Sequence, residues 1–324
     1  MQQRPLGRSG LAVSRLALGT MTWGRDTDAD DAAAQLKSYL DAGGNLVDTA
    51  DVYADGEAEA VIGSLLGALV PRDELFIATK AGLRPGHARR RDGSRGHLLH
   101  SLDASLRRLG TDHVDLFQVH AYDPDTPLEE TLTALDHAVA SGRVRYVGVS
   151  NFSAWQTAQA ATWQVAFPGR APIVATQVEY SLLERGIERE VLPACAALGL
   201  GVLPWSPLGR GVLTGKYRNG RPADSRAASP HFGPFVVPYL EPRCSSIVEA
   251  VATAASGLGV SPLEVALAWI RDRPGVVAPI LGARTVGQLL GALQVERMTL
   301  PPEITQALDD VSAIPVGYPE REDY

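Results

Sequence analysis

The chain has little cysteine, because only Cys195 and Cys244 occur among its 324 residues. Two cysteines make neither a disulfide framework nor a metal-binding spacing, so we expect a protein of the reducing cytoplasm. The start of the chain lacks the apolar core of a signal peptide. A run of about 18 apolar residues, which a membrane span would need, is also missing. We therefore expect neither secretion nor a membrane span.

The chain also lacks an excess of positive charge. Its 30 lysine and arginine residues stand against 37 aspartate and glutamate residues, which makes the net charge −7. We accordingly expect no binding surface for nucleic acid or an anionic membrane. Hydrophobic residues make up 45% of the chain and charged residues 21%, so an ordinary core is expected without disulfide support. We expect a single domain over residues 1–324.

Short apolar runs recur along the chain, and their continuous apolar character predicts strands buried on both faces of a parallel sheet. The eight runs are residues 14–20, 44–50, 74–80, 114–120, 144–150, 173–180, 201–207 and 275–283. Helical patterns separate them, and several end in glycine, which favours a left-handed C-cap. This alternation predicts an α/β fold, a (β/α)8 TIM barrel. A doubly wound sheet is the alternative, but it needs a glycine-rich phosphate loop, and the sequence holds no G-x-G-x-x-G.

Two segments stand outside this alternation. Residues 4–15 hold a Gly-Arg-Ser-Gly turn between short apolar runs, which predicts an N-terminal β-hairpin at the bottom of the barrel. Residues 206–243 form a long loop, rich in glycine and proline, after the seventh strand. Loops of this length in compact domains are usually functional lids or disordered segments.

In such a barrel, the active groups lie at the C-terminal ends of the strands. Three predicted strand ends carry titratable groups, namely Asp48, Lys80 and His120, and Tyr53 follows Asp48 on the next loop. The other predicted ends carry polar or aromatic side chains: Ser150, Asn151, Gln177, Trp205 and Ser206. The topology thus directs a carboxylate, a phenol, an ammonium and an imidazole toward one place.

These groups suit the donation of a proton to an oxygen on which negative charge develops. An ammonium about 4 Å from a phenolate stabilises it by roughly 4 kcal/mol, or about three pKa units, at an effective dielectric constant near 20. We therefore expect Lys80 to bring the pKa of Tyr53 from about 10 toward neutrality. Asp48 would hold Lys80 charged, and His120 would orient a carbonyl oxygen. A Schiff-base aldolase is an alternative that needs a neutral Lys80, which Asp48 disfavours.

The strand ends belong to longer motifs that resemble those of the aldo-keto reductases. Three segments are similar to the catalytic signatures of that family: LVDTADVY (46–53), FIATK (76–80) and VDLFQVH (114–120). Other matches follow in order along nearly the whole chain, in GRSGLAVSRLALGT, VGVSNF, TQVEYSLL, WSPLGRGVLTGKY and PILGARTVGQL. The resemblance implies a (β/α)8 barrel that binds NADPH at its C-terminal face and reduces an aldehyde or ketone to an alcohol.

The resemblance also implies roles for single residues. It makes Tyr53 the general acid, tuned by Lys80 and Asp48, while His120 orients the carbonyl substrate and nicotinamide C4 supplies the hydride. The implied NADPH-binding residues are Thr20, Met21, Asp48, Ser150, Asn151, Gln177, Trp205, Ser206, Leu208, Gly209, Arg210, Lys216, Gly282, Arg284 and Gln288. Among these, Arg284 would meet the 2′-phosphate. Trp205 would stack on the nicotinamide, as in the branch that includes the potassium-channel β subunits.

The resemblance leaves open the roles of Trp23 and of the basic run 87–97, the cofactor preference and an alternative function. Trp23 belongs either to the wall of the substrate pocket or to the core or surface, and the basic run 87–97 is either a solvated loop or a pocket wall. Gly291 and Ala292 stand where the family often has an acidic residue and an asparagine near the adenine, so the strength of the preference for NADP over NAD stays open. The alternative function is a cofactor-binding, redox-sensing subunit with slow turnover.

The acidic residues around Tyr53 do not predict a metal site. Asp48, Asp51 and Asp55 match no calcium-loop spacing, and Lys80 would repel a cation. Asp51 receives no role beyond that of a solvated or loop-capping carboxylate. The sequence also leaves open the identity of the carbonyl substrate, the physiological direction of the reaction and the oligomeric state.

Overall fold

The computed structural model describes residues 1–223, 225–229, 232–315 and 317–318. Its first element is an antiparallel hairpin of β1 (Gln3–Pro5) and β2 (Ala12–Ser14). The turn packs closely on the barrel, since a Cβ atom on Gly7 would lie 2.3 Å from the carbonyl oxygen of Val174, near the start of a barrel strand. Arg4 donates hydrogen bonds to the carbonyls of Arg271 and Val276. The predicted hairpin at the bottom of the barrel is therefore confirmed.

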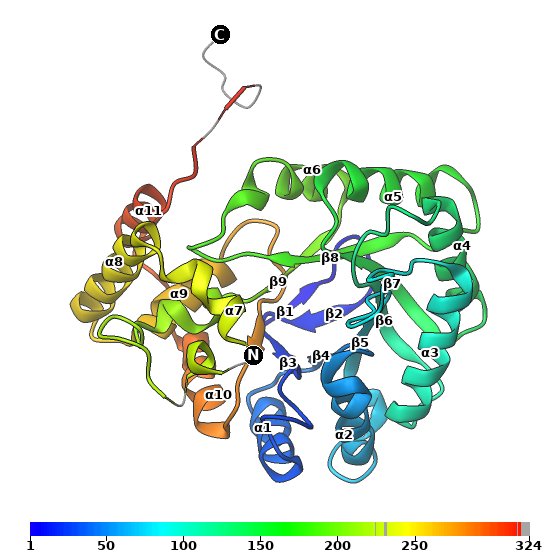
Figure 1. Ribbon diagram of the computed structural model, residues 1–324, viewed down its shortest axis with the longest axis horizontal. Helices are drawn as coiled ribbons and strands as arrows, with labels where there is room; N and C mark the ends of the chain where they lie inside the picture. Colours follow the sequence, from blue (N-terminus) through cyan, green and yellow to red (C-terminus); the bar gives the residue numbers. More distant parts are fainter. Residues whose placement is uncertain (224, 230–231, 316, 319–324) are drawn as a thin grey trace.

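Eight parallel strands surround the centre of the molecule in the order β10-β3-β4-β5-β6-β7-β8-β9 (Figure 1). They are β3 (Ala17–Gly19), β4 (Leu46–Asp48), β5 (Phe76–Ala81), β6 (Val114–Val119), β7 (Val144–Ser150), β8 (Ile173–Glu179), β9 (Gly201–Trp205) and β10 (Ile280–Gly282). Val202 of β9 pairs with Val276, just before β10. The N–H of Val277 donates to the carbonyl of Val202 at 2.9 Å. The sheet therefore closes, and the predicted (β/α)8 barrel is confirmed.

Helices surround the sheet, except α7, which lies in the long loop after β9 (Figure 1). The helices have the following bounds: α1 (Ala29–Asp41), α2 (Glu57–Leu65), α3 (Arg95–Leu109), α4 (Leu128–Ala140), α5 (Ala154–Ala166), α6 (Val191–Leu198), α7 (Gly233–Val236), α8 (Pro242–Leu258), α9 (Pro262–Arg271), α10 (Val286–Leu293) and α11 (Pro302–Val311). Local sequence explains several boundaries. Asp28 caps α1 by accepting from the N–H of Asp31, and α3 ends at Gly110, whose φ of 62° suits glycine.

Helix α9 is the element that the sequence patterns do not predict. Its residues from Val265 to Arg271 are all buried, so the helix has no polar face to reveal its period. A start signal is nevertheless present, because Ser261 and Glu264 form a capping box and Pro262 occupies the first turn. Within the described residues, no single helix is long and apolar enough to cross a membrane; α8 and α9 meet that test only as a pair bent by 102°.

The inside of the barrel changes from apolar to polar along the strands. Side chains two residues apart share one face of a strand, so Leu46 and Asp48 of β4 point the same way, as do Ala78 and Lys80 of β5. Leu46 and Ala78 belong to a buried apolar cluster that also contains Leu6 of the hairpin turn. The apolar layer therefore supports the polar groups from below, and the charged residues at the strand ends face the C-terminal mouth.

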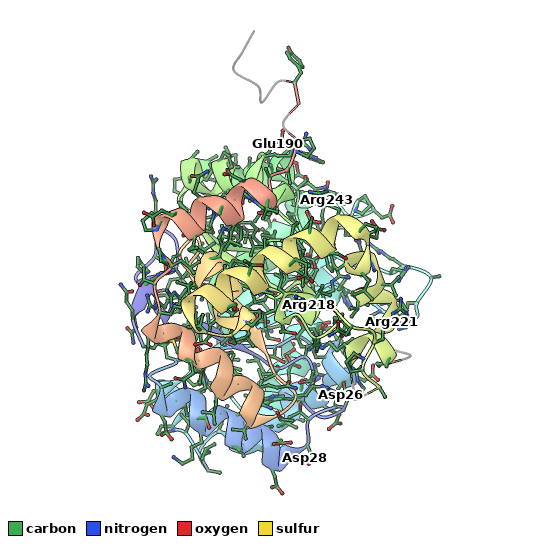
Figure 2. The ribbon with its side chains drawn as sticks, turned by 90° about the vertical axis from the view of Figure 1, so that its left-hand side faces the viewer. Asp26, Asp28, Glu190, Arg218, Arg221 and Arg243 are labelled. Carbon is green, nitrogen blue, oxygen red and sulfur yellow. The ribbon has the colours of Figure 1, made fainter. Side chains whose placement is uncertain are left out.

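The long loop predicted after the seventh strand follows β9 and contains short helical turns. These are η4 (Gly209–Thr214), η5 (Arg226–Ala228), α7 and η6 (Val237–Leu240). Asp224, Pro230 and His231 of this loop lie outside the described residues. Arg218 pairs with Glu249 of α8 at 2.5 Å, and Figure 2 shows Arg218 beside that helix. The loop is thus attached to the outer helices while its first part faces the barrel mouth.

Candidate active site

A cavity of about 540 Å³ opens at the C-terminal ends of the strands. It brings together most of the residues that the sequence places in the site. These are Thr20, Met21, Asp48, Tyr53, His120, Ser150, Asn151, Gln177, Trp205, Ser206, Leu208, Arg210, Lys216, Gly282, Arg284 and Gln288. Groups that are far apart in sequence thus converge on one space because parallel strands end at the same rim.

Lys80 lies fully buried beneath the wall of this cavity. Its Nζ donates to Oδ2 of Asp48 at 2.8 Å and to the carbonyl of Thr49 at 2.6 Å. The same Nζ lies 5.0 Å from the ring centroid of Tyr53. Gln177 donates to the other oxygen of Asp48 at 2.7 Å, so the carboxylate is held from both sides. Lys80 therefore acts on the cavity through its neighbours.

The charge of Lys80 is stabilised by these contacts. Burial lowers the pKa of Lys80, but Asp48 and Tyr53 raise it by more, so the pKa lies above its usual value. Lys80 stays an ammonium at neutral pH, as the sequence predicts. A charged amine cannot attack a carbonyl, which disfavours the Schiff-base aldolase.

The predicted fall in the pKa of Tyr53 needs correction. Burial raises the pKa of Tyr53 by more than Lys80 lowers it, and Asp48 raises it further. The pKa of the phenol therefore lies above 10 rather than near neutrality. The sequence-based reasoning included the ammonium but not the loss of water around the phenol. Tyr53 keeps its proton at neutral pH, and the stabilisation by Lys80 appears only as phenolate character develops.

His120 faces Tyr53 edge to face, with ring centroids 6.1 Å apart. Burial, followed by the positive charge of Lys80, holds the pKa of His120 well below its usual value. The imidazole is therefore neutral and can donate one hydrogen bond to an oxygen. Its Nδ1 is shielded from solvent and has no hydrogen-bond partner among the described residues.

Polar side chains extend from His120 along the cavity. Asn151 donates to the carbonyl of His120 at 3.0 Å and to Oγ of Ser150 at 3.1 Å. It accepts from the indole N–H of Trp205 at 3.1 Å. Asn151 and Ser206 have φ values of 56° and 52°, a left-handed backbone that is uncommon for residues other than glycine. These contacts fix a flat aromatic surface beside amide and hydroxyl groups, which suits a planar amide-bearing ring.

The far end of the cavity is basic. It is lined by Lys216 and Arg226 of the long loop and by Arg284, which follows β10. Burial lowers the pKa of Arg226, and the charge of Arg284 lowers it further, so two guanidinium groups lie close enough to repel each other. A phosphate group between them would relieve this repulsion. The aromatic face and the basic side chains of this cavity therefore fit a dinucleotide.

Besides the buried Lys80, the structure separates two predicted residues from the cavity. Trp23 is fully buried, and its indole donates to Gln35 of α1 at 3.2 Å, so of the interpretations left open by the sequence, the core is correct and the substrate pocket is not. Gly209 is also buried, and a Cβ atom there would lie 2.6 Å from Cδ1 of Leu183. Its left-handed turn shapes the loop, while the neighbouring Gly211 lines the cavity in its place.

Arg210 lines the cavity, but its guanidinium is already engaged. It pairs with Glu179 of β8 at 2.8 Å, donates to the carbonyl of Phe235, and lies 5.7 Å from the ring centroid of Trp205. This contact joins the start of the long loop to α7 and to the barrel. The side chain of Arg210 thus ties the start of the loop to β8 and α7.

Sequence reasoning missed several cavity residues, including Arg226, Phe235 and Leu83. The first two lie in the long loop, where no regular period predicts which side chains turn inward. The basic run 87–97 follows Leu83, and its Arg89 donates to Asp123 at 2.8 Å. No described residue of the run lines the cavity, so the run packs on the loop after β6.

Comparison with known proteins agrees with this geometry. Residues 15–313 match the sequence model of the Aldo/keto reductase family. The chain is 37% identical to an uncharacterized oxidoreductase, YrpG, and 32% identical to the aldo-keto reductase YhdN, both of Bacillus subtilis. It is also 38% identical to a probable voltage-gated potassium channel subunit beta of Oryza sativa. These alignments cover 98%, 98% and 99% of this chain and 98%, 96% and 98% of the relatives. The chain belongs to the aldo/keto reductase family.

Proposed function

We propose that the protein reduces an aldehyde or ketone to an alcohol with NADPH. The observation that carries the proposal is the contact of buried Lys80 with Asp48 beneath Tyr53, next to a neutral His120. When bound, NADPH would supply a hydride to the carbonyl carbon. The protein would orient the carbonyl and supply the proton. A carbonyl oxygen placed between Tyr53 and His120 meets one proton donor and one hydrogen-bond donor.

Tyr53 transfers its proton to the oxygen as negative charge develops there. The phenolate that forms lies against the ammonium of Lys80, which stabilises it without leaving its bond to Asp48. The neutral imidazole of His120 orients the oxygen and does not compete as an acid. Water then restores the proton of Tyr53, so the balanced reaction adds one hydride and one proton to the carbonyl.

The basic end of the cavity supports NADPH over NADH in this proposal. Arg284 and Arg226 would hold the 2′-phosphate, which NADH lacks, and Lys216 would lie near the pyrophosphate. Gln288 accepts from the backbone N–H of Arg284 at 2.9 Å and so fixes the start of α10. Ala292 lines the cavity, and a Cβ atom on the adjacent, exposed Gly291 would meet no heavy atom of the described residues within 4 Å, so neither residue offers a polar side chain to an adenine.

The test is a panel of aldehydes and ketones followed by the absorbance of reduced nicotinamide, with NADPH and NADH side by side. We expect steady turnover that requires Tyr53 and is faster with NADPH at low cofactor concentration. If tight NADPH binding were accompanied by no turnover of any panel member, the reductase proposal would fail.

A second function is a cofactor-binding, redox-sensing subunit with slow turnover. The specific observations that favour it are the similarity to the probable channel subunit of Oryza sativa and Trp205 at the nicotinamide position. A burst of one reduction per protein, followed by release of oxidised cofactor that limits the rate, would support it. Sustained turnover with several aldehydes would favour the reductase instead.

A further inference from the structure

Asp51 lies on the loop between Asp48 and Tyr53, and the proposed reaction does not use it. Its backbone N–H donates to the carbonyl of Lys80 at 3.0 Å, which anchors the loop to β5. Its carboxylate lies among Glu59 of α2 and Ser101 and Arg108 of α3. The Oδ1 atom of Asp51 is shielded from solvent and has no hydrogen-bond partner among the described residues.

The neighbours of Asp51 already satisfy one another. Glu59 is fully buried and accepts from Oγ1 of Thr79 at 2.5 Å and from Nε of Arg108 at 2.8 Å. Arg108 also packs beneath the loop, because a Cβ atom on Gly56 would lie 2.8 Å from its Cδ. Two carboxylates therefore share one guanidinium. When both are ionised, this partly buried cluster carries an excess negative charge.

This crowding favours the proton-bearing form of Asp51. Burial raises the pKa of Asp51 to about 7, and the negative charge of Glu59 raises it as well, against the opposing effects of Arg108 and of hydrogen bonds from Ser101 and the backbone of Val52. Asp51 therefore changes charge close to neutral pH. His120 has a pKa well below its usual value, and Lys80 and Tyr53 have raised pKa values, so these three keep their charge states in that range.

The charge of Asp51 acts on Tyr53, two residues away. The pKa of Tyr53 depends first on burial and on the charges of Lys80 and Asp48. The negative charge of Asp51 makes a smaller contribution, which raises the pKa of Tyr53. A negative Asp51 thus opposes the phenolate that forms as Tyr53 gives up its proton, whereas a neutral Asp51 does not. Asp51 does not line the cavity and would act only through Tyr53 and its loop.

We propose that Asp51 is a positioning residue whose protonation permits proton donation by Tyr53 and whose ionisation restrains it. This inference rests on the proposed function of Tyr53 as the acid in carbonyl reduction. Its sign is definite: the rate of reduction falls as the pH rises through the range in which Asp51 loses its proton. The loop thereby couples the chemical step to pH without a titrating group in the cavity.

The test compares two variants that each remove one negative charge from the same loop. Asp51→Asn keeps the shape of the side chain but stays neutral at every pH. Asp55→Asn is the matched control, because Asp55 is exposed and lies outside the cluster. We measure kcat for reduction of one panel aldehyde at saturating NADPH, from about two pH units below neutrality to two above.

In wild type and Asp55→Asn, kcat should fall roughly fivefold as the pH rises through a step centred near pH 7. A change of this size is expected from one partly screened charge interaction. Asp51→Asn should match wild type at low pH and exceed it by that factor at high pH. A variant slowed equally at all pH values would show a merely structural role and overturn the proposal. An unchanged step in Asp51→Asn would overturn it too.

Two further measurements cover a poorly folding variant and a failed function. Glu59→Gln removes the charge next to Asp51 and should move the step in kcat to lower pH. The second measurement is folding stability, which requires no substrate. Between the ordinary pKa of 3.8 and about 7, Asp51 keeps its proton in the folded state and loses it in the unfolded state. Wild type should therefore lose stability relative to Asp51→Asn as the pH rises through that window. A wild type without turnover refutes the proposed function, whereas turnover with an identical pH profile in Asp51→Asn refutes the role of Asp51 alone.

Discussion

Replacement of Asp48 by asparagine tests the central electrostatic contact of the site. The amide keeps the size of the carboxylate and can still meet Gln177, but it removes the charge 2.8 Å from Nζ of Lys80. At that distance and an effective dielectric constant of about 20, two unit charges attract by roughly 6 kcal/mol. Removal of one partner of a buried pair typically destabilises a protein by about 3–5 kcal/mol, since the other charge stays buried.

The expected loss of folding stability in Asp48→Asn is therefore about 3–5 kcal/mol near neutral pH. The loss should also depend on pH. In wild type, the raised pKa of Lys80 keeps its contribution complete up to the ordinary pKa of 10.5, and it is lost only above the folded pKa. In the variant, Asp48 no longer raises the pKa of Lys80, and only Tyr53 opposes the lowering by burial, so we expect this pKa to fall below 10.5. The folded state then loses the proton of Lys80 at a lower pH than the unfolded state does. Folding stability therefore rises with pH over that window.

Urea unfolding followed by tryptophan fluorescence, at about pH 6 and about pH 9, measures both effects. The control is Asp41→Asn, which removes a partner from the exposed pair of Asp41 with Lys37 at 2.9 Å and should cost under about 1 kcal/mol at either pH. A loss in Asp48→Asn as small as in the control, with no dependence on pH, would refute the reasoning that Asp48 holds Lys80 charged.

Three other expectations follow from the site. Tyr53→Phe should lower kcat by about 10²–10⁴-fold, the usual contribution of a general acid, while NADPH affinity measured by fluorescence stays within about twofold; near wild-type turnover would remove Tyr53 from the acid role. Arg284→Ala and Arg226→Ala should each weaken NADPH by roughly tenfold and NADH far less, since a charged hydrogen bond is worth about 1.5 kcal/mol or more; equal losses for both cofactors would contradict contact with the 2′-phosphate. Glu179→Gln removes the charged partner of Arg210 and should speed NADPH release in stopped-flow experiments, because the loop then opens more readily; an unchanged release rate would show that this contact does not hold the loop.

Much of the fold follows from local sequence. Continuous apolar runs predict the barrel strands because both faces of those strands are covered, and turn residues predict the N-terminal hairpin. Helix α9 escapes the same reasoning, because its residues from Val265 to Arg271 are buried on every side and periodicity needs a polar face. Trp23 shows the same limit at one residue, since a tryptophan after a strand can turn toward the core or the cavity with no change in pattern.

The sequence by itself determined which groups meet at the mouth of the barrel, because in a parallel barrel every strand ends at the same rim. Asp48, Lys80 and His120 follow from that rule and from the ends of apolar runs. Only the tertiary structure decided how those groups are charged. The burial of Tyr53 raises its pKa against the pull of Lys80, and the enclosure of Asp51 beside Glu59 gives that residue a proton near neutral pH. The free energy of a charge depends on the water removed around it, and that removal is a property of packed neighbours from the whole chain.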